Sequence, residues 1–89
     1  MTIKLTEEIW KEGNMYVSYC PELDIPSCGK SIRQARDNLK DVLLINIQET
    51  QQLGTFDLFL QEAGFVENQD HVLSVRKELV GFTPIEIGI

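Results

Sequence analysis

The alternation of apolar and polar residues at the start of the chain predicts a β-hairpin. In residues 2–10 the apolar side chains mostly fall on odd positions, the two-residue period of a half-buried strand: Ile3, Leu5 and Ile9. Residues 11–14 contain a glycine and an asparagine, which tolerate positive φ, and a second β-prone run follows at residues 15–20. The two runs are therefore expected to pair.

Two prolines restrict the next segment, and a helix start follows it. Pro21 and Pro26 lack an N–H, so only a short or edge strand fits here, and we place it at residues 25–28. Ser31 and Gln34 have the spacing of a capping box, in which each side chain satisfies a free backbone N–H. A long helix is expected to begin at this point.

The predicted long helix has one clean apolar face only in its first half. Leu44 and Ile45 point away from that face and need another apolar surface to cover them. A second, short helix is predicted over residues 55–64, where Phe56 and Phe59 follow helical spacing. This helix could cover Leu44 and Ile45; if it does not, they form an exposed patch.

The last apolar alternation lies at residues 84–89, which we predict to be a strand, while residues 66–82 carry no clear pattern. The expected fold is α+β with two layers in the order β-β-β-α-(α)-β, built as a single domain over residues 1–89 with its core in residues 1–52. The terminal strand would lie parallel to the first, with the helices on one sheet face. The other face, which includes Trp10, would stay uncovered and favour self-association or partner binding.

Composition and charge narrow the function classes. The chain is 43% hydrophobic and 25% charged, as in ordinary globular proteins, and no apolar run approaches the roughly 20 residues of a membrane span. Without a signal-peptide pattern, we expect a cytoplasmic protein. The net charge of −6 argues against DNA or RNA backbone binding and favours a basic protein as partner.

One stretch, YVSYCPELDIPSCGKSIRQARDNL, resembles the signature of HicB-like antitoxins, in which a hairpin strand and a Cys-Pro-Glu-Leu turn lead to a capped helix. The matching positions are Tyr16, Val17, Tyr19, Cys20, Pro21, Glu22, Leu23, Gly29, Ser31, Ala35 and Leu39. The chain departs from the family pattern at residues 24–26, where a tight Pro-Gly is usual. Many family members also carry a C-terminal DNA-binding segment, for which residues 65–89 are too short and too acidic.

The resemblance implies a partial ribonuclease H-like fold without nuclease chemistry. It also implies that the chain neutralises a HicA-type toxin, a small basic protein that cuts messenger RNA, and that it forms a homodimer or higher homo-oligomer. An alternative is a stand-alone structural or regulatory homo-oligomer without a toxin. We place the partner or oligomer interface on six residues: Trp10, Tyr16, Leu44, Ile45, Phe56 and Phe59.

The sequence offers few candidate residues for catalysis or for binding a metal or cofactor. A metal-dependent nuclease would need converging carboxylates, for which the chain offers Glu7, Asp37, Asp41 and Glu86, but the two aspartates fall on the predicted solvent face of the helix. Cys20 and Cys28 lack the spacing and partners of a zinc site and are expected to be packing thiols. His71 lies in a polar stretch and is expected at the surface. We therefore predict a non-catalytic protein without a metal or cofactor.

Overall fold

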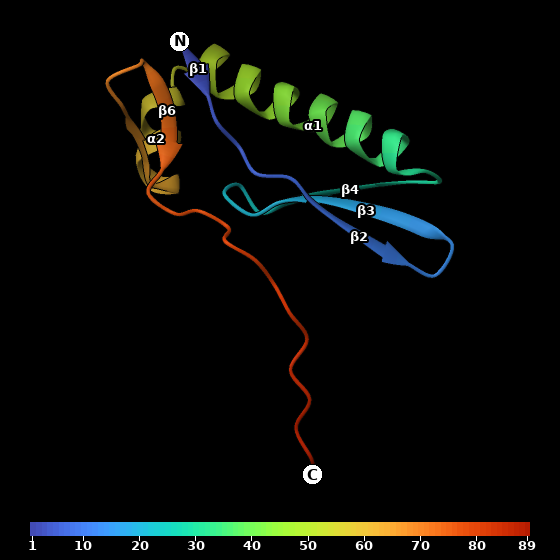
Figure 1. Cartoon of the computed structure of the whole chain (residues 1–89). Helices are drawn as coiled ribbons and strands as arrows, with labels where there is room; N and C mark the ends of the chain where they lie inside the picture. The colour runs from blue at the N-terminus through green and yellow to red at the C-terminus, as the bar shows by residue number, and fades with distance from the viewer.

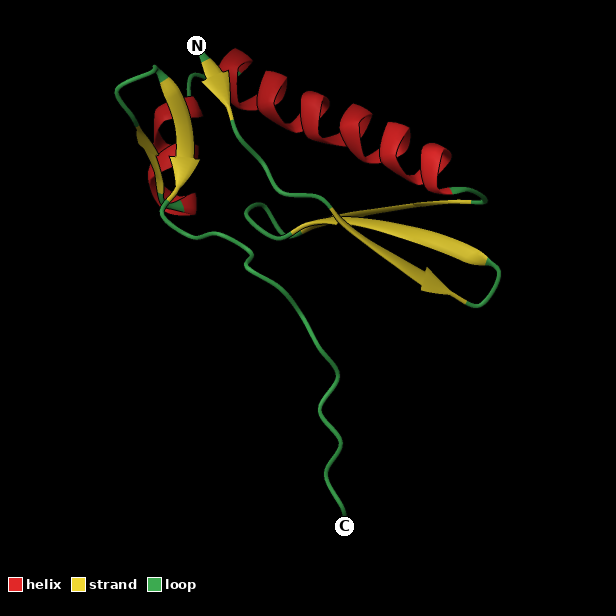
Figure 2. Ribbon diagram, viewed as in Figure 1, coloured by secondary structure: helices red, strands yellow, loops and turns green.

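The computed structural model describes residues 1–89 and has an α+β fold with two small sheets and two helices (Figures 1 and 2). The elements in chain order are β1 (Thr2–Ile3), β2 (Glu8–Glu12), β3 (Met15–Cys20), β4 (Ile25–Gly29), α1 (Ile32–Gln52), α2 (Phe56–Ala63), β5 (Phe65–Glu67) and β6 (Val72–Val75). One sheet has the strand order β2-β3-β4 and is antiparallel. The other has the order β1-β6-β5, in which β1 and β6 are parallel.

The predicted hairpin is confirmed, but the first predicted strand is divided. β2 and β3 pair through a turn at Gly13, whose φ is +59°. The strand predicted at residues 2–10 is wrong between β1 and β2, because the chain there changes partners. The backbone N–H of Thr6 donates to Glu22 Oε1 at 2.8 Å, in place of a carbonyl of a neighbouring strand. The first run therefore joins two different sheets.

The predicted capping residues begin α1. The N–H of Gln34 donates to Ser31 Oγ at 3.0 Å, and Gln34 Oε1 accepts from the N–H of Lys30 at 2.6 Å. The helix then lies over one face of the β2-β3-β4 sheet (Figure 1). The close approach depends on Gly29, because a Cβ there would stand 2.6 Å from the backbone nitrogen of Ala35. The short helix α2 is also confirmed and ends at Gly64, with φ of +84°.

The strand predicted at residues 84–89 is wrong. Residues 76–89, called the tail below, contain no helix or strand; Phe82 packs against Trp10, and the end of the tail runs away from the rest of the chain (Figure 2). The position parallel to β1 is taken instead by β6, with Thr2 opposite Val72. β6 lies within residues 66–82, for which the sequence pattern gave no prediction. The tail alternates as a strand should, but it has no neighbouring strand to pair with.

Few side chains are fully shielded from solvent. The buried residues number 7 of 89, of which Cys20, Ala35, Leu39, Phe65 and Leu73 form the apolar core. The accessible surface is 7248 Å² for a mass of 10.2 kDa, whereas a compact monomer of this mass exposes about 5,300 Å². The Cα radius of gyration is 15.3 Å, against about 12 Å expected for this length. Neither helix has the length and apolarity needed to cross a bilayer.

Candidate protein interface

The face of the β2-β3-β4 sheet that points away from α1 carries the largest exposed aromatic residue. Ser18 and Cys20 of β3 are buried, so their side of the sheet is the one under α1. Alternate residues of a strand point to opposite faces, and Trp10 pairs with Val17, which places both on the other side. We call this side the open face. Its residues are Glu8, Trp10, Glu12, Met15, Val17, Tyr19, Pro26 and Cys28.

Trp10 stands at the centre of the open face among acidic groups. It is 45% exposed, and Met15 on the same face is 38% exposed. Its ring lies 5.3 Å from that of Phe82, centroid to centroid, with the planes tilted by 52°. The hydroxyl of Tyr19 donates to Asp24 Oδ1, and this hydrogen bond to a carboxylate raises the pKa of Tyr19. The open face therefore combines exposed apolar surface with negative charge.

Tyr16, which we grouped with Trp10 as an interface residue, lies on the opposite face of the sheet. It pairs with Lys11 on one side and Gly29 on the other, and neither belongs to the open face. The ammonium of Lys11 stands 5.9 Å from the centre of the Tyr16 ring. The structure thus separates these two aromatic residues. Tyr19 is the tyrosine that shares a face with Trp10.

A second exposed apolar patch lies on α1. Leu44 and Ile45 are 54% and 58% exposed, so α2 does not cover them. Phe56 and Phe59 of α2 are half-buried, and their rings stack on each other with centroids 6.3 Å apart. Because α1 lies on the covered side of the sheet, we treat Leu44 and Ile45 as a helix patch separate from the open face. The predicted interface residues therefore do not form one surface.

Glu7, a carboxylate that a metal site would require, has structural partners. Arg36 Nε lies 2.9 Å from Glu7 Oε1, and Ser18 Oγ donates to Glu7 Oε2 at 3.0 Å. These contacts tie the segment between β1 and β2 to α1 and β3. Glu7 thereby helps to hold the two sheets to the helix.

Glu22, in the β3–β4 turn, also ties the segment between β1 and β2 to the rest of the chain. It accepts hydrogen bonds from the backbone N–H and hydroxyl of Thr6 and from the thiol of Cys20. Burial alone would raise the pKa of Glu22, but the hydrogen bonds from Thr6 outweigh it, and the pKa is lowered. Burial raises the pKa of Cys20 to about 11, and the carboxylate of Glu22 adds to this effect. Cys20 is thus an inert packing thiol at neutral pH.

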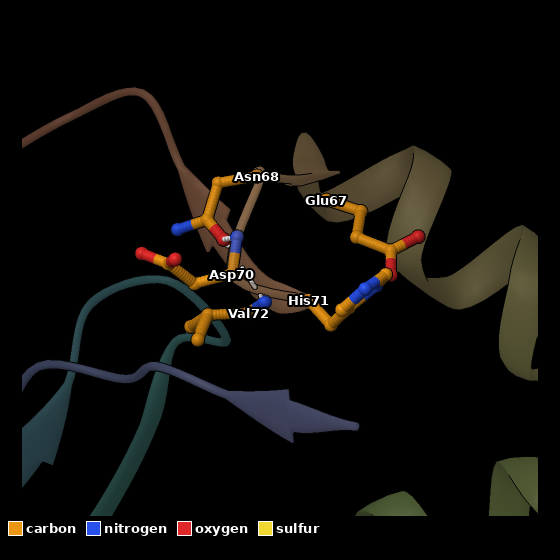
Figure 3. Close-up of polar contacts among 5 residues, drawn as sticks. All are labelled: Glu67, Asn68, Asp70, His71 and Val72. Carbon is orange, nitrogen blue, oxygen red and sulfur yellow. Dashed lines mark hydrogen bonds and ion pairs between the residues drawn. The ribbon is translucent and has the colours of Figure 1, made fainter.

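His71, the single histidine, shapes the turn between β5 and β6 (Figure 3). Asn68 Oδ1 accepts from the N–H groups of Asp70 and Val72, at 2.9 and 3.0 Å. His71 itself has a φ of +60°, a conformation that histidine adopts more readily than most residues. Its Nδ1 lies 3.0 Å from Glu67 Oε1 at the surface. The side chains of Asn68 and His71 therefore both make their polar contacts within this turn.

The remaining polar groups do not gather into a metal centre. No three histidine, cysteine, aspartate or glutamate side chains are placed to hold a metal ion. A groove of about 630 Å³ between residues 5–7 and α1 brings two of the candidate carboxylates, Glu7 and Asp37, together with three cations, Arg33, Arg36 and Lys40. In comparisons with known proteins, no family model, no curated protein and no solved structure matches the chain.

Proposed function

We propose that the chain is a protein-binding module of the HicB-like antitoxin type, which binds and neutralises a HicA-type toxin through its open face. The observation that carries this proposal is the open face, on which Trp10 stays 45% exposed although the Phe82 ring packs beside it. Aromatic anchors of this kind contribute most of the binding energy at protein interfaces. The resemblance of residues 16–39 to the HicB-like signature supplies the identity of the partner.

Charge supports a basic partner for the same face. Glu8 and Glu12 lie on the open face on either side of Trp10, and the whole chain carries a net charge of −6. A HicA-type toxin is basic because it binds RNA, so the two surfaces attract each other and meet faster at low salt. Covering the toxin's RNA-binding surface would stop cleavage without any chemistry by the antitoxin.

Binding to a purified HicA-type toxin, measured by calorimetry together with inhibition of its RNA cleavage, tests the proposal. We expect Trp10→Ala to weaken binding at least tenfold, since it removes the anchor of the open face. Ile45→Ala is the matched control, because it removes a more exposed apolar side chain, 58% against 45% for Trp10, from the helix patch. Absence of a complex, or weaker binding only in the Ile45 variant, would contradict the proposal.

A second candidate function is a stand-alone structural or regulatory homo-oligomer without a toxin. The observation that favours it is the accessible surface, which exceeds that of a compact monomer by roughly 1,900 Å². Self-association would cover this surface whether or not a toxin exists. Toxin binding separates the two functions, because only the antitoxin requires it.

A further inference from the structure

The tail has the pattern of a strand and no strand to pair with. Ile85, Ile87 and Ile89 alternate with Glu86 and Gly88, the period of a half-buried strand. In the single chain, Ile85 and Ile87 are 83% and 79% exposed. Figure 1 shows this segment leading away from both sheets. Exposed β-branched residues in an unpaired segment are ready to add to the edge of another sheet.

The sheet β2-β3-β4 has a free edge that could accept such a strand. β2 is its outermost strand and pairs only with β3. β6 pairs with β1 and not with β2, and the last backbone hydrogen bond between β6 and the segment after β1 runs from the N–H of Lys4 to the carbonyl of Leu73. No backbone hydrogen bond outside the sheet reaches residues 8–12. The outer N–H and C=O groups of β2 therefore have no protein partner.

The area left exposed is more than a dimer needs from each chain. Stable protein–protein interfaces bury about 1,200–2,000 Å² in total, or about 800 Å² from each partner. The chain exposes roughly 1,900 Å² more than a compact monomer of its mass. The exposed side chains of the tail, Ile85 and Ile87 among them, contribute to this excess. A second copy of the same chain offers both a tail and a free β2 edge in the complementary arrangement.

We propose that residues 84–89 of one copy pair with the free edge of β2 in a second copy, and that the exchange is reciprocal about a two-fold axis. Such an interface is closed, because each copy donates one strand and accepts one. The contact between Phe82 and Trp10 places the residue just before the proposed strand beside its own β2. Pairing at an edge adds a strand in the plane of the sheet and adds no cover to the open face beyond the Phe82 ring of the same chain. The dimer therefore does not depend on toxin binding.

Light scattering on the full chain, combined with hydrogen exchange, tests the exchange of strands. We expect a mass of twice 10.2 kDa and slow exchange at alternate amides of residues 85–89 and of β2, those that point toward the paired strand. Dilution to monomer should speed exchange of the tail amides at least tenfold. A monomer at every concentration, or a dimer whose tail amides exchange freely, would overturn the proposal.

A proline pair locates the contact within the tail. Ile87→Pro removes an N–H from the proposed strand and should give a monomer, and its 79% exposure means that the single chain does not need it to fold. Val80→Pro makes the same change at a residue that is 95% exposed and lies before the strand, and it should remain a dimer. A dimeric Ile87 variant, or loss of the dimer in both, would refute pairing through residues 84–89.

Discussion

At the scale of single residues, the fold changes the ionisation of Cys20. Burial raises its pKa to about 11, whereas an unfolded cysteine ionises near pH 8.5. Between these values the unfolded state loses its proton first, so the free energy of unfolding falls as the pH rises from about 9 to 11. The expected loss is about 2–3 kcal/mol.

Denaturant titrations at pH 8 and pH 11 measure this loss of unfolding free energy. Cys20→Ala should flatten the dependence, and an equal fall in that variant would contradict the assignment.

Glu22 is the second residue whose environment sets a measurable outcome. Its two oxygens accept from Thr6 and Cys20, so Glu22→Gln replaces one acceptor by an amide donor. We expect a loss of about 1–2 kcal/mol in the free energy of unfolding. Because the hydrogen bonds lower the pKa of Glu22, this stabilisation disappears as the pH falls through that lowered value. Glu62→Gln on α2 is the control, and an equal loss there in urea titrations would exclude a specific role.

At the scale of elements, the contact between β4 and α1 is the tightest. A Cβ at Gly29 would stand 2.6 Å from Ala35 N and 2.9 Å from the carbonyl carbon of Gln34, both backbone atoms that cannot turn aside. Gly29→Ala should therefore destabilise the chain by about 1–3 kcal/mol. Gly81→Ala is the matched control, because no atom lies within 4 Å of the added carbon. Similar midpoints for both variants in urea unfolding would contradict this packing.

Local signals predicted the elements that depend on neighbouring residues. The capping box at Ser31 and the left-handed glycine at Gly64 placed the helices, and the turn at Gly13 placed β2 beside β3. Residues 84–89 show the limit, because alternation describes what a backbone prefers and not which edge it meets. β6 was not predicted for a related reason: it pairs with β1, which lies near the other end of the chain, and local sequence does not show such a partner.

The same limit applies to the candidate interface. The sequence predicted that Trp10, Leu44 and Ile45 are exposed, because none of them falls on the apolar face of its strand or helix. The separation of Trp10 from Tyr16 depends instead on the register of the hairpin, which pairs Glu12 with Met15. A two-residue turn at positions 13 and 14 implies this register, so parity counted outward from the turn would have placed Tyr19 beside Trp10. The contact with Phe82 had no sequence signal.

At the scale of the whole molecule, the buried core is uneven. Five of the buried residues lie where α1 meets β3 and β4: Ser18, Cys20, Gly29, Ala35 and Leu39. The sheet β1-β6-β5 contributes only Phe65 and Leu73, and β1 pairs through only two residues. The contacts through Glu7 and Glu22 tie the β1–β2 segment, which leads out of this sheet, to α1, β3 and the β3–β4 turn. The two sheets therefore differ in what stabilises them.

This uneven core predicts unequal local stability. Amides of β3 are paired on both sides and lie beneath a helix, so they should open only in global unfolding. Amides of β5 and β6 should exchange at least tenfold faster, because few buried apolar contacts hold their sheet. Native-state hydrogen exchange followed by NMR measures both sets in one sample. Leu39→Ala removes the largest fully buried side chain beneath α1 and should speed exchange in β3 more than in β6. Equal protection of β3 and β6 would instead mean that the two sheets unfold as one cooperative unit.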